Sequence, residues 1–465
     1  MRLVMKFGGT AVDSPDKIRH VAKLLKSYHD RGDEVVCVVS AVRGMTDGLL
    51  AIAESVRRGD KSSIEDFVKK ARKIHVDIVE GAIANQELKE KALAQVSRTA
   101  GELEDVLGGI VLLGEVTPKS LDYLMSFGER LTAPIVSCAL QDVGLDSQPF
   151  TGKEAGVVTD SNFGEARPLI DTTKLRVGLT IEPVLKRGAI PVITGFLGAD
   201  QHGNTTTIGR GGSDYTATIV AASVNADEVW LWSDVDGLVK EAQVLKEVSF
   251  AEAIEMALFG AKYMHPRALE PVMDTKIPVR IRNTFNVGHP GTVITQSPSH
   301  DSQKIVKSVN AIRHTALIDV SGGGMVGTPG TAAKIFDTLA RNKVNIMMIS
   351  QSPSESSITM VVRKSDLDKA TTTLELNLLG KVIKHIDVSD DVAVIAVVGS
   401  GMRGIKGVAA KVFGAVAKHE VNVIMIAQGS SELNLAFVVN DRDCEKAVRA
   451  LHDEFGLGKK RERSK

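Results

Sequence analysis

Cysteine, aromatic residues, net charge and long apolar runs are all scarce in this chain of 465 residues. Its three cysteines, Cys37, Cys138 and Cys444, are widely spaced and match no metal-binding pattern, which favours a reducing compartment. Aromatic residues make up only 4%, and 57 basic residues balance 57 acidic ones, so the chain lacks the features of a nucleic-acid-binding protein. No apolar run reaches membrane-spanning length, and no signal-peptide layout is present. We therefore expect a cytoplasmic protein that binds neither membrane nor nucleic acid.

Residues 1–298 alternate short apolar segments with amphipathic ones, which is typical of an α/β domain. Runs such as EVVCVVSAV (34–42), IPVITGF (190–196) and EVWLWSDV (228–235) indicate buried parallel strands. A charge-rich helical pattern over about 55–113 predicts a helical insertion that covers the sheet. We therefore predict an open, mostly parallel sheet sandwiched by helices.

Residues 305–465 contain an internal repeat, because GGGMVGTPG from Gly322 returns as GSGMRGIKG from Gly399. Each copy predicts a strand, a glycine loop, a helix and two further strands, as in a small ferredoxin-like module. We place these modules at 305–382 and 383–465, with strands that can interleave between them. Each copy also spells GxGxxG, but the next strand ends at Gln351 or Gln428 and not at an acidic residue that could hold a ribose. We therefore expect no NAD.

Two glycine-rich loops in the first domain carry charged residues that a plain turn does not need. KFGGT (6–10) and GRGGSDYTA (209–217) each follow an apolar strand. Glycine lets backbone N–H groups converge on an anion, and ligands of such sheets bind at the carboxyl ends of the strands. A lysine in one loop and an arginine, a serine and an aspartate in the other suit phosphoryl transfer.

The order of these motifs resembles that of the aspartate kinases (aspartokinases). The motifs that carry the resemblance are these two loops, VVSAV (38–42) with Thr46-Asp47, SFGERL (126–131), TGF (194–196) and GAKYMHPRALEP (260–271), and the similarity runs over nearly the whole chain. The repeats are similar to the tandem ACT modules of the same family. The resemblance implies transfer of the γ-phosphoryl group of ATP, with Mg²⁺, to the β-carboxylate of L-aspartate. The product, 4-phospho-L-aspartate, begins lysine, threonine and methionine biosynthesis.

The resemblance also assigns roles to individual residues. Lys6 would neutralise the transferring phosphoryl group, and Asp214 would position Lys6 and Lys262. A helix N-cap is the alternative role for Asp214. The nucleotide-binding residues that the resemblance implies are Lys6, Gly8, Gly9, Thr10, Ser233, Asp234 and Lys262.

The substrate amino acid would be recognised by two opposite charges. Arg210 can form a bidentate contact with a carboxylate, and Glu129 can accept hydrogen bonds from the α-ammonium group. Hydroxyl donors would come from Ser40, Thr46 and Ser213. No general base is needed, since the β-carboxylate is already ionised at neutral pH. The sequence shows no dedicated metal cluster, so we expect Mg²⁺ to arrive with the nucleotide.

The ACT-like modules imply feedback inhibition by an end-product amino acid and assembly into a homodimer or a larger oligomer. The effector-binding residues that the resemblance implies are Gly330, Ala332, Gln351, Asn422 and Val423. These residues leave threonine and lysine open as effectors.

One departure from the family pattern keeps other functions open. Relatives continue the WSDVDG strand with a segment that contacts the nucleotide, whereas here Gly237 is followed by LVKEAQVLKEVSF, about seven residues shorter. This departure puts the affinity for ATP in question. An amino-acid sensor with a disabled kinase domain and a different amino-acid kinase, such as a glutamate 5-kinase, are therefore the alternatives.

Overall fold

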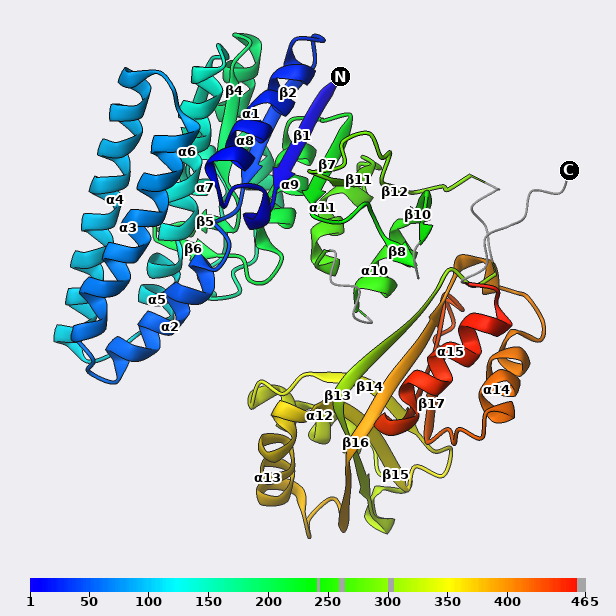
Figure 1. Ribbon diagram of the computed structural model, residues 1–465. Helices are drawn as coiled ribbons and strands as arrows, with labels where there is room; N and C mark the ends of the chain where they lie inside the picture. The colour runs from blue at the N-terminus through cyan, green and yellow to red at the C-terminus, as the bar shows by residue number, and fades with distance from the viewer. Residues whose placement is uncertain (241–242, 259–263, 300–304, 458–465) are drawn as a thin grey trace, which may run out of the picture. The chain divides into compact units, whose positions relative to one another are not determined.

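The computed structural model describes residues 1–240, 243–258, 264–299 and 305–457 and divides the chain into two compact units (Figure 1). The N-terminal unit comprises Met1–Val239, Val244–Phe250 and Lys262–Pro298. The C-terminal unit comprises Lys240–Gln243, Ala251–Ala261 and Ser299–Lys465. This division differs from the predicted boundaries mainly at helix α10 (Phe250–Leu258), which from Ala251 onward groups with the C-terminal unit.

An eight-stranded sheet forms the centre of the N-terminal unit, in the order β10-β12-β11-β7-β1-β2-β4-β3. Neighbouring strands run parallel except β11 and β12, which are antiparallel. The strands are β1 (Arg2–Phe7), β2 (Glu34–Val39), β3 (Ser147–Phe150), β4 (Ile190–Thr194), β7 (Glu228–Ser233), β10 (Glu247–Ser249), β11 (Val279–Asn283) and β12 (Thr292–Thr295). The predicted mostly parallel sheet is therefore confirmed.

Helices cover both faces of this sheet. Leu3, Met5 and Phe7 of β1 enter a core that α1 and α6 share, whereas Val4 points to the opposite face, as the period of two in a strand requires. Helices α8 and α9 pack against each other and against the sheet. Helices α3 and α4 lie within the segment 55–113 where a helical insertion is predicted, whereas α2 begins ten residues before it. The α-helices are α1 (Pro15–His29), α2 (Met45–Arg57), α3 (Ser62–Ala82), α4 (Gln86–Leu113), α5 (Pro118–Met125), α6 (Phe127–Asp142), α7 (Gly152–Ala155), α8 (Ile170–Lys186), α9 (Gly212–Ser223) and α11 (Glu270–Met273).

Short elements complete the N-terminal unit. They are the hairpin of β5 (Leu197–Ala199) and β6 (Thr205–Thr207) and the 3-10 helices η1 (Gly9–Ala11) and η2 (Pro266–Leu269). The paired strands β8 (Val239–Lys240) and β9 (Gln243–Val244) have residues in both units.

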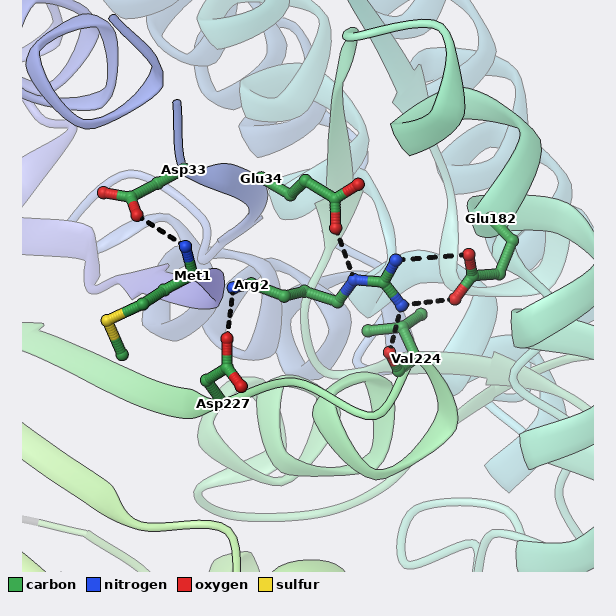
Figure 2. A network of polar contacts seen from close by, with 7 residues as sticks. All are labelled: Met1, Arg2, Asp33, Glu34, Glu182, Val224 and Asp227. Atoms are coloured by element: carbon green, nitrogen blue, oxygen red, sulfur yellow. Dashed lines mark hydrogen bonds and ion pairs between the residues drawn. The ribbon is translucent and has the colours of Figure 1, made fainter. Parts of the chain in front are cut away.

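Arg2 anchors the amino end of β1 (Figure 2). Its guanidinium contacts the Glu34 carboxylate of β2 at 2.7 Å and the Glu182 carboxylate of α8 at 2.5 Å, and it also donates to the Val224 carbonyl. Its backbone N–H donates to Asp227 at 2.7 Å. This network joins β1 to β2, to the residue that precedes β7 and to α8. It fixes one end of β1, and Lys6 lies near the other end.

The C-terminal unit is built on a six-stranded antiparallel sheet in the order β14-β15-β13-β16-β18-β17. The two long central strands, β13 and β16, contribute to the cores of both modules. In β13, for example, Val309 packs in one core with Phe437, whereas Ala316 packs in the other core with Ile335. The elements are β13 (Ser308–Ser321), α12 (Thr331–Arg341), β14 (Ile346–Gln351), β15 (Ser357–Arg363), α13 (Leu367–Leu378), β16 (His385–Val398), α14 (Val408–Lys418), β17 (Met425–Ala427), β18 (Asn434–Asn440) and α15 (Cys444–Glu454), with 3-10 turns η4 (Gly323–Met325), η5 (Lys364–Asp366), η6 (Ser400–Met402) and η7 (Asp441–Asp443).

Helix α10 is attached to the second module by a buried ion pair. Lys307 Nζ lies 2.7 Å from Glu252 Oε2, and both side chains are almost completely buried. The Ser400 N–H donates to Glu252 Oε1 at 2.8 Å, and Asn434 donates to Glu255 at 2.5 Å. These contacts explain why α10 groups with the C-terminal unit although it follows β10 of the sheet in the chain.

Candidate active site

A cavity of about 580 Å³ in the N-terminal unit collects all of the predicted catalytic and substrate-binding residues. It lies at the carboxyl ends of β1 and β2, where the topology of a parallel sheet places ligand sites. The predicted residues that line it are Lys6, Gly9, Ser40, Thr46, Glu129, Arg210, Ser213 and Asp214.

Close packing of the backbone explains two of the motif glycines. A Cβ on Gly9 would lie 2.6 Å from the Ala41 carbonyl oxygen, so a side chain would push the first loop away from the end of β2. A Cβ on Gly195 would lie 2.6 Å from the Ser213 Cβ, so the absence of a side chain at Gly195 lets the start of α9 approach the end of β4. Glycine at these positions therefore holds the KFGGT and GRGGSD loops against the rim of the sheet.

Lys6 and Asp214 form an ion pair at the base of this cavity. Lys6 Nζ lies 2.6 Å from Asp214 Oδ1, and both side chains are largely buried. The alternative of Asp214 as a helix N-cap is wrong, because Gly211 holds the N-cap position of α9 and Asp214 lies inside the first turn. The carboxylate instead pairs with the Lys6 ammonium group, and both residues line the cavity.

Glu129 is a buried carboxyl group with one free oxygen. Its Oε1 accepts a hydrogen bond from the Ala41 N–H at 3.2 Å, and among the described residues its Oε2 has no partner. Burial raises the pKa of Glu129 to about 8. A buried acceptor that lines a cavity without a donor is suited to a cationic ligand group.

Arg210 lies between two glycines with left-handed backbone, Gly209 at φ 77° and Gly211 at φ 71°. Gly211 is also required by space, since its Cβ would lie 2.2 Å from the Cβ of His265. His265 accepts a hydrogen bond from the Arg267 N–H at 3.3 Å and caps η2, in keeping with a structural role. The loop thus presents the exposed Arg210 side chain at the cavity.

The predicted nucleotide-binding residues Gly8, Thr10, Ser233 and Asp234 do not line this cavity, but they lie at the same edge of the sheet. Strands β1 and β7 are neighbours, and the Gly8 N–H donates to the Trp232 carbonyl at 3.4 Å. Lys262 lies outside the described residues.

Asp122 was not predicted from the sequence, although it lines the cavity. It belongs to α5, is 1% exposed and accepts hydrogen bonds from Gly164 and Thr207. No glycine loop or charged motif surrounds it in the sequence, so no local signal distinguishes it from other helix carboxylates.

A second cavity of about 310 Å³, in the first repeat, contains Gly330, Ala332 and Gln351 together with Glu355. Gly330 is the N-cap of α12 and has a φ of 86°. The predicted Asn422 and Val423 do not line it. They precede β17, which lies beside β14, the strand that ends at Gln351. The predicted effector residues are thus divided between two repeats of one sheet.

Among the described residues, no group of three histidine, cysteine, aspartate or glutamate side chains is placed to hold a metal ion. None of the helices in the described part of the chain combines the length and the apolar character needed to cross a membrane.

Comparisons with known proteins agree with this architecture. Residues 1–283 match the amino acid kinase family, and residues 318–378 and 395–455 each match the ACT domain. An aspartate kinase of Pseudomonas fluorescens is 31% identical, with 98% of this chain and 97% of the relative covered. A bifunctional aspartokinase/homoserine dehydrogenase of Zea mays is 33% identical over 98% of this chain. The chain spans about half the length of that bifunctional relative and of the similar plant proteins.

Solved structures extend the similarity to three dimensions. Aspartokinase III of Escherichia coli in complex with aspartate and ADP has a TM-score of 0.83 and 28% identity, covering 98% of this chain and 99% of that one. The same enzyme in complex with lysine and aspartate has a TM-score of 0.78. The chain therefore belongs to the amino acid kinase family, in the branch formed by aspartate kinases with C-terminal ACT domains. The resemblance inferred from the motifs is confirmed, whereas the cytoplasmic location stays a prediction.

Proposed function

We propose that this protein transfers the γ-phosphoryl group of MgATP to the β-carboxylate of L-aspartate and releases ADP and 4-phospho-L-aspartate. The observation that carries the proposal is the shared cavity, which combines the Lys6–Asp214 ion pair with an unpartnered Glu129 oxygen and with Arg210. Arg210 would suit the α-carboxylate of an amino acid, Glu129 its ammonium group, and Lys6 the phosphoryl group. The cavity therefore matches an amino acid that reacts through its second carboxylate.

The two charged side chains divide the recognition of the substrate head group. Glu129 Oε2 would accept a hydrogen bond from the α-ammonium group, and Arg210 would contact a carboxylate with two parallel N–H bonds. The hydroxyl groups of Ser40, Thr46 and Ser213 line the same cavity and would orient the substrate. Head-group recognition of this kind leaves the β-carboxylate to meet the phosphoryl donor.

Positioning and charge stabilisation account for the catalysis, because the attacking carboxylate needs no general base. Phosphoryl transfer passes through a transition state in which charge spreads over the phosphoryl oxygens. The Lys6 ammonium would stabilise that charge, and Asp214 would hold the ammonium at 2.6 Å in the required orientation. Mg²⁺ would bridge the phosphates as part of the nucleotide substrate.

We propose that lysine or threonine inhibits the enzyme at the ACT modules. The cavity at Gly330, Ala332 and Gln351 has the size for a small amino acid, and a structurally similar aspartokinase is described in complex with lysine. The modules would also join two chains into a homodimer or a larger oligomer. Ile349 on the edge strand β14 and Ile426 on β17, 44% and 47% exposed, support an apolar contact there.

The short segment after Gly237 supports the alternative of a sensor without kinase activity. Ser233 and Asp234 remain at the edge of the sheet, but a nucleotide would have fewer contacts than the longer segment provides in relatives. On the enzyme reading, the KM for ATP should therefore lie above the usual range of about 1 μM to 1 mM.

A single assay separates the proposed functions. ADP release and hydroxylamine-trapped acyl phosphate are measured with aspartate, with glutamate and without acceptor, each with and without lysine or threonine. The proposal predicts far more hydroxamate with aspartate than with glutamate and a lower rate with one effector. Hydroxamate from glutamate alone would indicate a glutamate kinase. Effector binding without any hydroxamate, at ATP concentrations well above 1 mM, would indicate a sensor.

A further inference from the structure

Asp122 is a buried carboxylate whose hydrogen-bond donors are all uncharged groups. It lies on α5, is 1% exposed, and no lysine or arginine contributes to its pKa, which desolvation raises above its usual value. Its Oδ2 accepts from the Thr207 N–H at 2.8 Å and from the Gly164 N–H at 3.0 Å, and its Oδ1 accepts from the Thr207 hydroxyl at 2.7 Å. Burying a carboxylate without a counter-charge is unfavourable, so a role for packing alone does not account for an acid here.

The three hydrogen bonds join the two halves of the substrate cavity. Asp122 stands seven residues before Glu129, and Ser126 is at once the C-cap of α5 and the N-cap of α6, so both carboxyl groups belong to one helical element. Thr207 ends β6, and the chain reaches Arg210 three residues later. The element that carries Glu129 is thereby bonded to the segment that carries Arg210.

Two of the hydrogen bonds come from backbone N–H groups, those of Gly164 and Thr207. They therefore constrain the path of the main chain at both residues. Gly164 and Thr207 themselves line the cavity. Asp122 also lines the cavity, but both carboxylate oxygens already accept hydrogen bonds and the residue is 1% exposed, so we expect it to act on the substrate through these two segments. An asparagine would offer one acceptor oxygen and turn an NH₂ group towards a donor.

We propose that Asp122 is a positioning residue that sets the spacing between Glu129, at the head-group end of the cavity, and the segment from Arg210 to Asp214, whose aspartate pairs with Lys6, and thereby selects the length of the acceptor amino acid. The proposal rests on the proposed roles of Glu129 and Lys6. Aspartate and glutamate differ by one methylene, about 1.5 Å of chain. A displacement of about 1 Å at such a site is enough to lower the rate about 100-fold. A rigid spacing is therefore a means of separating two substrates that carry the same charges.

The test uses the full-length Asp122→Asn variant. We expect kcat/KM for aspartate to fall about 100-fold, mainly through KM, with the KM for ATP changed less than twofold. The ratio of kcat/KM for aspartate to that for glutamate should fall at least tenfold. The milder Thr207→Val variant removes one hydroxyl donor and keeps both backbone bonds. It should lower the same ratio by a smaller factor, and it decides the question if Asp122→Asn does not fold.

Asp200→Asn is the matched control, because Asp200 is also a loop-anchoring carboxylate of the N-terminal unit. Asp200 is 5% exposed and accepts bonds from the His202 and Asn204 N–H groups and from Ser161, at the turn between β5 and β6 away from the cavity. This variant should lower the melting temperature and leave the substrate ratio unchanged. A lower melting temperature in Asp122→Asn with an unchanged ratio and an unchanged aspartate KM would overturn the proposal.

Binding measurements separate this proposal from the proposed function. Isothermal titration with aspartate and with glutamate gives the ratio of the two Kd values without any turnover. If the unaltered protein binds aspartate but transfers no phosphoryl group, the kinase function fails, while a fall of the Kd ratio in Asp122→Asn still supports the positioning role. Equal Kd ratios in the variant and the unaltered protein would refute that role.

Discussion

If Glu129 binds the substrate ammonium group as proposed, its protonation should make aspartate binding depend on pH. In the empty cavity burial raises the pKa of this carboxyl group to about 8, so at neutral pH most molecules carry a proton there. An ammonium group that contacts Oε2 favours the ionised form, and binding therefore releases that proton. Tighter binding is expected as the pH rises towards 8.

The size of the effect follows from the fraction of Glu129 that is already ionised. With a pKa of about 8, this fraction is about 1% at pH 6 and about 50% at pH 8. The KM for aspartate should therefore be about 50-fold higher at pH 6 than at pH 8 and should level off above that value. The carboxylates of aspartate itself stay ionised throughout this range.

The assay measures the aspartate KM from pH 6 to 9 at saturating ATP and counts the protons released on binding by titration in buffers of different ionisation enthalpy. Glu129→Gln should raise the KM and remove its pH dependence.

The pH dependence of the free energy of unfolding gives an independent test. Because the folded-state pKa is raised, the native state binds the proton more strongly, and stability should fall as the pH rises from about 4.5 to 8. The glutamine variant should lack this loss. A flat KM profile in the unaltered protein would refute the assignment of Glu129 to the ammonium group.

Four further substitutions test the remaining assignments. Arg210→Lys should raise the aspartate KM at least tenfold, because one ammonium cannot replace a bidentate guanidinium, and an unchanged KM would remove Arg210 from the substrate site. Lys6→Ala should lower kcat about 100-fold or more in steady-state assays, whereas near-normal turnover would show that another group stabilises the transferred phosphoryl. Gln351→Ala should raise the inhibitory effector concentration about 5- to 150-fold without changing uninhibited kcat, and identical inhibition curves would place the effector elsewhere. Lys307→Met leaves the Glu252 carboxylate buried without its lysine and should destabilise the C-terminal unit by about 3–5 kcal/mol in denaturant unfolding; a loss below about 1 kcal/mol would contradict that reasoning.

Much of the fold could be predicted because its signals are local in the chain. The buried strands β2, β4 and β7 appear as short apolar runs in the sequence, and the structure places them within those runs. The repeat was visible as two copies of one glycine loop and helix. The N-cap alternative for Asp214 failed because the chain turns at Gly211, three residues earlier than a capping aspartate would require.

The candidate site was partly predictable for the same reason. Gly9 and Arg210 belong to motifs in which glycine and charge occur together, and that combination is rare in plain turns. Asp122 offered no such signal. Its partner Thr207 is 85 residues away along the chain, so the contact exists only once α5 and β6 have packed together.

The sequence by itself determined the strands, the repeated module and the candidate residues for phosphate and amino-acid binding, because periodicity, glycine and charge act over a few neighbouring positions. Only the tertiary structure decided that burial raises the pKa of Glu129, that Asp122 joins two halves of the cavity and that α10 packs with the C-terminal unit. These properties depend on burial and on partners distant in the chain, such as Lys307 for Glu252. Desolvation and pairing arise from packing, and no local pattern of residues encodes them.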